Sequence, residues 1–212
     1  MTFASTIPAA TRVDAPAEST HLQHYIRLLP EGLNSYPDCQ IKASIYRTYL
    51  ADGTVPIQAA ALPRELADLV NEPRAMTQWI PAVHSLAITI AYRDLCGDDE
   101  TFAAFVAQRA RRMYSSKAYR VLMAAASPAQ LIRLSSVRWH RFHRGFELEV
   151  FGVSARSAQI QIEFPEHLYL PDHLVGMAAA MSSAVELSGG RDVRSAIGAT
   201  TPTRAVIELF WR

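Results

Sequence analysis

The chain has 212 residues, of which 50% are hydrophobic and 19% are charged, and its formal net charge at pH 7 is +1. This composition is too apolar for a disordered chain, and a chain of this length can bury a full core without disulfide bonds. The near-zero net charge gives no general argument for nucleic acid, and the two cysteines, Cys39 and Cys96, are too few for a disulfide framework. We therefore expect a cytoplasmic protein.

The first 20 residues differ in composition from the rest of the chain. Residues 1–20 are rich in Ala, Thr, Ser and Pro and lack the basic start and the apolar run of a secretory signal. We predict a flexible arm over 1–20 and a single α+β domain over 21–212. The most apolar internal run, 79–92, is shorter than the roughly 20 residues that a bilayer crossing needs, so no membrane span is expected.

Helical periodicity dominates the first two-thirds of the chain. Residues 21–29 predict a short amphipathic helix, and 38–53 predict a second one that begins at Asp38. Residues 56–72 contain Pro63 and predict two short helices or one kinked helix. Residues 77–96 are apolar nearly all round and predict a central buried helix, which Gly97 ends.

Three further helices are expected before the pattern changes. Residues 98–114 open with three acids, which suit the positive end of a helix, and residues 116–126 predict a shorter helix. A third helix is expected over 127–137, where Ser127 is the predicted cap and Pro128 the first helical residue.

After Arg144 the hydrophobic period changes from helical to alternating. Residues 146–150 and 158–164 predict two strands of a hairpin, joined by a turn at 152–157. Residues 171–190 predict a helix with an Asp cap and a Gly-Gly end, and 192–200 and 202–212 predict two more strands. The predicted fold is α+β: a helical N-terminal half packed on a four-stranded antiparallel sheet, with a β-β-α-β-β C-terminal part.

The stretch RWHRFHRG, residues 138–145, is the most conspicuous polar motif. His140 and His143 are three residues apart, but in an extended segment they would point to opposite faces and could not chelate one metal. The neighbouring arginines would also repel a divalent cation. We interpret the stretch as the solvated start of a strand, with Trp139 and Phe142 as core anchors, and we expect neither a metal site nor a nucleic-acid site here.

No sequence pattern indicates catalysis. The chain contains neither a Gly-x-Ser-x-Gly turn nor a glycine-rich phosphate loop. We predict no catalytic residue, and our interpretation favours a protein that is not an enzyme.

Several segments resemble an uncharacterised family that is abundant in myxobacteria. They are SPAQLIRLSSVRW, FELEVFGVSARSAQIQIEF, LPDHLVGMAAAMSSAVELSGG and RAVIELFWR, and the resemblance covers about residues 30–212. That family looks like a relative of the vinyl-reductase-like small-molecule-binding domains, the TRAPP tethering subunits and the haem nitric-oxide-binding domains. The resemblance implies helices on one face of a twisted antiparallel sheet, an apolar cavity and dimers or larger assemblies.

The haem relatives imply a histidine ligand on a helix and a Tyr-x-Ser-x-Arg motif. In YSSKAYR, Tyr114 and Ser116 match this motif, but Ala118 stands where arginine is needed. His84 lies on the apolar helix, where a histidine is typically a core residue with a satisfied hydrogen bond. We therefore expect no cofactor, haem included. The cysteine-cluster relatives are no better match, because the chain has no Cys-x-x-Cys motif.

Three functions remain open at this point. The first is a non-enzymatic binding module that holds an apolar small molecule or acyl chain in a cavity between helices and sheet and acts in sensing or regulation. Helical periodicity gives the following pocket residues: Tyr46, Tyr49, Trp79, His84, Ile88, Tyr92, Met177 and Met181.

The second function is a protein-interaction or scaffold subunit of the tethering kind, which docks a GTPase or another partner. Residues 101–146 contain no acid and nine basic residues, and we predict a surface for an anionic partner at Arg109, Arg111 and Arg112. The third function is an enzyme that acts on an apolar biosynthetic substrate. For each of them we expect a homodimer or a protein partner.

Overall fold

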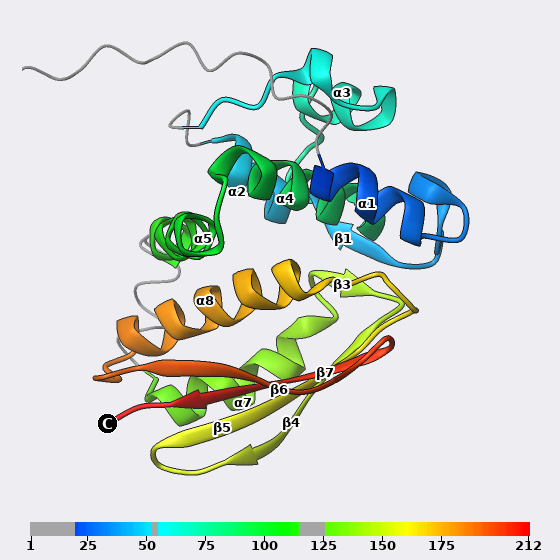
Figure 1. Ribbon diagram of the computed structural model, residues 1–212. Helices are drawn as coiled ribbons and strands as arrows, with labels where there is room; N and C mark the ends of the chain where they lie inside the picture. Colours follow the sequence, from blue (N-terminus) through cyan, green and yellow to red (C-terminus); the bar gives the residue numbers. More distant parts are fainter. Residues whose placement is uncertain (1–19, 52–54, 115–125) are drawn as a thin grey trace, which may run out of the picture.

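The computed structural model describes residues 20–51, 55–114 and 126–212. The fold is α+β, with a helical N-terminal half and a four-stranded antiparallel sheet in the C-terminal half, as the sequence predicted (Figure 1). Among the described helices, none combines the length and the apolar character that a bilayer crossing requires. The helix predicted over 116–126 lies almost wholly outside the described residues.

The N-terminal half consists of helices and two very short strands. In chain order these are α1 (Thr20–Leu28), the 3-10 helix η1 (Gly32–Asn34), β1 (Gln40–Lys42), α2 (Ala43–Leu50), the 3-10 helix η2 (Ala59–Ala61), α3 (Arg64–Asn71), β2 (Trp79–Pro81), α4 (Ala82–Cys96) and α5 (Asp99–Tyr114). Pro63 separates η2 from α3, so the predicted break at this proline is confirmed.

The C-terminal half contains the longer strands. Its elements are α7 (Pro128–Trp139), β3 (His143–Arg144), β4 (Glu147–Val153), β5 (Ser157–Glu163), α8 (Pro171–Leu187), β6 (Arg194–Thr201) and β7 (Arg204–Phe210). The strand order is β4-β5-β7-β6, and every neighbouring pair is antiparallel. Side chains alternate between the two faces of the sheet. Ile160, Ile162 and Ile207 are buried on the inner face, while Gln159 and Glu163 are exposed on the outer face.

The helices form layers above the inner face of this sheet. α7 contacts β4 and β5, and α8 contacts β6 and β7. α4 and α5 then pack on α8, so that α8 lies between the sheet and the N-terminal half (Figure 1). Glycine and alanine in α8 permit this close approach: Gly176, for example, lies against the side chains of Phe102 and Val106.

A second, three-stranded sheet, of order β2-β1-β3, was not predicted. The helices expected to begin at Asp38 and Thr77 begin instead at Ala43 and Ala82, each after a three-residue strand. Three residues are too few for an alternating pattern to stand out in a sequence. Proline also shapes β2, because the residue before a proline favours extended backbone and proline cannot donate to the helix that follows.

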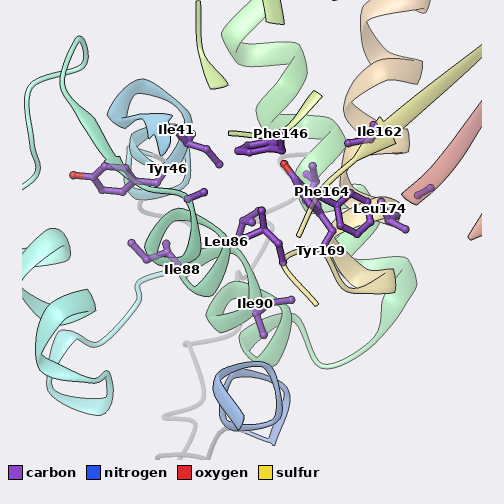
Figure 2. Packing of buried hydrophobic residues seen from close by; sticks show 14 of the residues in the cluster. Ile41, Tyr46, Leu86, Ile88, Ile90, Phe146, Ile162, Phe164, Tyr169 and Leu174 are labelled. Atoms are coloured by element: carbon purple, nitrogen blue, oxygen red, sulfur yellow. The ribbon is translucent and has the colours of Figure 1, made fainter. Parts of the chain in front are cut away.

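The core runs continuously through both halves. α4 is buried on nearly all sides, as its composition predicted, and Figure 2 shows Leu86 directed toward Tyr169 while Ile88 lies on the side of Tyr46. Two buried hydrogen bonds cross between the halves. The Tyr25 hydroxyl donates to the Leu168 carbonyl at 3.0 Å, and His173 Nε2 lies 3.1 Å from the Leu86 carbonyl.

Candidate functional site

A half-open cleft of about 410 Å³ lies where the two halves meet. Its walls come from the loop between α1 and β1, from the turn between β3 and β4, and from the segment after β5. The lining residues are Pro30, Glu31, Ser35, Tyr36, Pro37, Asp38, Cys39, Gly145 and Pro165.

Close backbone contacts join two segments that line the cleft. Gly145 has a φ of +77°, and a Cβ atom there would lie 2.7 Å from the Asp38 carbonyl oxygen and 2.9 Å from Cys39 Sγ. The Cys39 thiol donates to the Gly145 carbonyl at 3.2 Å. Only glycine therefore allows the chain before β4 to approach the chain before β1 so closely.

One wall of the cleft is held in an unusual backbone conformation. Tyr36 has a φ of 54°, in the left-handed region that residues with a side chain seldom adopt. Its hydroxyl donates to the Glu166 carbonyl at 2.6 Å, which ties the loop of the helical half to the segment that follows β5. Such strained positions persist where surrounding contacts fix them, and they occur often at binding sites.

The chemistry of the cleft suits binding better than covalent catalysis. Its walls are mostly apolar, with three proline rings, and the Glu31 and Asp38 carboxylates stand exposed at its mouth. Burial raises the pKa of the Cys39 thiol, and the neighbouring Asp38 carboxylate raises it further. A thiol in this state is protonated at neutral pH and is a poor nucleophile.

The residues predicted to line a pocket lie in several places, and none of them lines this cleft. Tyr49 and Tyr92 lie together with Phe105 in an aromatic cluster, with ring centroids 5.2–5.6 Å apart for the pairs that include Tyr92. Tyr46 is buried elsewhere, where its hydroxyl accepts a hydrogen bond from the Arg74 amide at 2.7 Å.

The other predicted pocket residues are equally dispersed. Trp79 lies on the solvent side of β2, His84 is hydrogen-bonded to the Leu33 carbonyl at 3.1 Å, and Ile88 is fully buried. Met177 and Met181 pack against the core from α8. Burial lowers the pKa of His84, as expected for a neutral histidine that packs in the protein interior.

The three arginines predicted to form an anionic-partner surface do not share one. Arg109 is buried, with its guanidinium over the Phe105, Tyr49 and Tyr92 rings and its Nη1 donating to the Thr48 carbonyl. Arg111 is exposed and pairs with Glu186 at 2.7 Å. Helical spacing places Arg109 and Arg112 on neighbouring positions of α5. Arg109, however, lies on the buried face of this helix, together with Phe102, Phe105 and Val106.

The two histidines of the polar stretch have different surroundings. His140 ends α7, is exposed and lies 3.5 Å from the Glu147 carboxylate. His143 begins β3, is half-buried and stacks on Trp139 with the ring centroids 3.6 Å apart. Trp139 is buried, and its indole nitrogen donates to the Phe146 carbonyl at 3.0 Å, which confirms it as a core anchor.

The fold is shared with solved H-NOX structures. The Fe(II) unliganded H-NOX protein from K. algicida superposes with a TM-score of 0.54 at 10% sequence identity, over 81% of this chain and 97% of that one. An alanine-to-glycine mutant of the same protein gives the same values. No protein-family model matches the chain, and no curated protein is similar to it. At 10% sequence identity this similarity shows a shared fold and nothing more.

These neighbours correct our expectation about cofactors. We expected none and set haem aside, whereas the solved proteins that share the fold are H-NOX proteins described with Fe(II). The absence of a complete Tyr-x-Ser-x-Arg motif was a poor guide, because a fold persists after sequence motifs have diverged. Of the three residues compared with that motif, Ser116 and Ala118 lie outside the described residues.

His173, although central in the core, has no ring nitrogen left for a haem iron. His173 uses both ring nitrogens, with Nδ1 accepting from the Leu170 amide at 2.9 Å and Nε2 facing the Leu86 carbonyl. His84 contacts the Leu33 carbonyl through Nε2 alone, an arrangement compatible with a metal at the other ring nitrogen, whereas His143 is stacked on Trp139. No group of three or more His, Cys, Asp or Glu side chains within the described ranges could hold a metal ion.

Proposed function

We propose that this protein is a non-enzymatic binding domain that holds an apolar small molecule in the cleft and acts in sensing. The observation that carries the proposal is that both halves of the fold build this cleft, through the loop at 30–39, Gly145 and Pro165. A molecule bound there would contact both halves at once. Its volume of about 410 Å³ is within the range of roughly 300–1,000 Å³ typical of small-molecule pockets.

The lining indicates the class of ligand. The rings of Pro30, Pro37 and Pro165 favour an apolar body, and the exposed carboxylates of Glu31 and Asp38 favour a hydrogen-bond donor or a positive charge at its end. The H-NOX neighbours are described with Fe(II), and a binding role for this chain follows from them only by analogy of fold. We also propose that the protein forms a homodimer, as expected from the sequence.

A ligand that binds only the folded protein must stabilise it. At a free concentration 100 times its dissociation constant the gain is about 2.7 kcal/mol, which a thermal-shift assay detects readily. The first experiment is therefore to extract the purified protein with organic solvent, identify the released compounds by mass spectrometry, and add them back while following the unfolding temperature.

The location of the ligand is tested with a cleft-filling variant. Pro37→Trp places a large ring on the exposed rim of the cleft, and Pro73→Trp is the matched control, because Pro73 is an exposed proline that does not line it. We expect Pro37→Trp to abolish ligand-induced stabilisation and Pro73→Trp to retain it. Equal stabilisation of both variants would place the ligand elsewhere, for example beside Tyr49 and Tyr92, and would contradict the proposal.

Cys39 gives an independent readout of cleft occupancy. In a Cys96→Ser background it is the single thiol of the chain, and Cys39 lines the cleft. Bound ligand should slow its alkylation by iodoacetamide. An alkylation rate that does not change at saturating ligand would count against binding in the cleft.

A further inference from the structure

The outer face of the three-stranded sheet carries a tryptophan whose ring contacts two cations. Lys42 of β1 lies directly opposite Trp79 of β2, and Gln40 lies opposite Arg144 of β3. Residues two apart on a strand share a face, so Lys42, Trp79 and Arg144 all project outward, while Ile41 and Ile80 are buried beneath them. We call Lys42, Trp79 and Arg144 the Trp79 patch.

Both cations of the patch lie close to one ring. Lys42 Nζ is 4.0 Å from the Trp79 ring centroid, and Arg144 Cζ is 3.9 Å from it. The two positive charges are therefore no more than about 8 Å apart. Lys42 Nζ also donates to the Thr77 carbonyl at 2.6 Å, which holds the ammonium group in place.

No carboxylate balances these charges in the part of the chain that is described. The ion pairs there include neither Lys42 nor Arg144, and they also lack Arg47 and Arg74. Arg47 Nη1 donates to the Arg74 carbonyl at 3.0 Å, which holds these two residues together. Cations that are held in place without an acid create a local positive potential although the net charge of the chain is only +1.

We propose that the Trp79 patch docks an acidic segment of a partner protein. Alternate side chains of an extended segment project from one face about 6.6 Å apart. Two glutamates spaced in this way match two cations that lie within about 8 Å of each other. The patch is an open surface, so a single small anion would be screened by water, whereas a segment with several carboxylates engages both cations together.

The same geometry disfavours single-stranded nucleic acid as the partner. Proteins that bind such strands stack bases on open aromatic faces. Here two cations already lie against the Trp79 ring, so a base would have to compete with them for contact with it. This inference is independent of the proposed cleft ligand, since none of the three patch residues lines the cleft.

The test measures binding of a labelled probe to the full chain. The probe is a fluorescein-labelled ten-residue peptide of alternating glutamate and serine, and binding is followed by fluorescence anisotropy at low salt. The double variant Lys42→Glu/Arg144→Glu should weaken binding by at least about tenfold, because it reverses both charges at the docking point. The charge-retaining variant Lys42→Arg/Arg144→Lys should bind within about threefold of the wild type.

The matched control reverses two cations elsewhere. Arg64 and Arg156 are exposed, lie outside the patch and are absent from the ion pairs of the described residues. Arg64→Glu/Arg156→Glu changes the net charge by the same amount and should alter binding by less than about twofold. Circular dichroism establishes that each variant is folded, and Lys42→Gln/Arg144→Gln replaces the reversal variant if that one is not.

Three results would overturn the proposal. The first is no binding of the peptide to the wild type, and the second is an equal loss with the control variant, which would mean a general charge effect. The third is tighter binding of a labelled ten-nucleotide oligothymidylate than of the peptide, with the same loss on charge reversal. That result would assign the patch to nucleic acid.

Discussion

At the scale of single residues, a buried histidine and a half-buried one stand out. His173 is 3% exposed and has a hydrogen-bond partner for each ring nitrogen, and His143 is stacked on Trp139. Burial lowers the pKa of His173 from 6.5 to about 4 and that of His143 from 6.5 to about 3. Both rings are therefore neutral in the folded protein over the whole range in which an unfolded chain takes up their protons.

This difference predicts acid sensitivity. Below pH 6.5 the two histidines bind protons in the unfolded state but stay neutral in the folded state. The free energy of unfolding should therefore fall as the pH drops from 6.5 toward 4. Each histidine contributes a slope of up to about 1.4 kcal/mol per pH unit. His143→Phe, which keeps a ring against Trp139, should give a shallower slope in urea unfolding, while the exposed-residue variant His24→Phe should not. Equal slopes for wild type and His143→Phe would contradict the assignment.

Gly145 predicts a second effect at this scale. Gly145→Ala adds a Cβ atom that meets backbone at 2.7 Å in a left-handed conformation, and we expect it to cost roughly 2–4 kcal/mol of stability. Gly97 has a φ of +83° with open space around it, so Gly97→Ala should cost only about 1 kcal/mol, from the backbone alone. Equilibrium unfolding of both variants measures the difference, and equal costs would mean that the contact with Asp38 and Cys39 is not tight.

Residue roles were the least predictable part of the site. The cleft depends on Cys39 and Gly145, which are 106 positions apart in sequence, and no local pattern reports such a contact. His173 was not singled out, because its partner Leu86 lies on another helix. Trp139 was predictable as a core residue, since a large aromatic side chain beside a strand is most stable when it is buried.

At the scale of elements, local signals were sufficient where caps and alternation are strong. α7 begins at Pro128, as predicted, and Ser127 and Gln130 form the reciprocal hydrogen bonds of a capping box. α8 differs, because its expected Asp cap is Asp172 inside the helix, and the Leu170 amide bonds instead to His173 Nδ1. The three-residue strands β1 and β2 were not predicted. They are recognisable as strands only through their pairing with each other, which a local sequence pattern does not show.

The α7 cap is directly testable. Ser127→Ala removes the hydroxyl that accepts from the Gln130 amide and should lower the free energy of unfolding by about 1 kcal/mol. Ser136→Ala, within the same helix, should be close to neutral, because its hydroxyl bonds only to the Arg133 carbonyl behind it. Chemical denaturation of the two variants distinguishes them, and equal effects would argue against the cap.

At the scale of the whole molecule, the fold class followed from the order of the periodic segments. The change of period after Arg144 predicted the strands, and the apolar helix at 77–96 predicted the centre of the core. The way the two halves pack against each other could not be predicted from the sequence. It depends on contacts such as that of Tyr25 with Leu168, which are 143 residues apart.

Because the core is continuous across the two halves, we predict a single unfolding transition. Far-ultraviolet circular dichroism and tryptophan fluorescence should give the same midpoint in urea. Tyr25→Phe leaves the buried Leu168 carbonyl without its donor and should lower that midpoint, at a cost of about 1–3 kcal/mol, without splitting the transition. Two separate transitions would indicate that the halves are independent domains.

The imidazole of His173 also has a dynamic consequence. Its Nδ1 accepts from an amide, so it carries no hydrogen, and the hydrogen must reside on Nε2, which faces a carbonyl in the interior. That hydrogen can reach solvent only when α8 separates from α4. The rate at which deuterium replaces this hydrogen, measured by nuclear magnetic resonance, would therefore report how often the native molecule opens at this place.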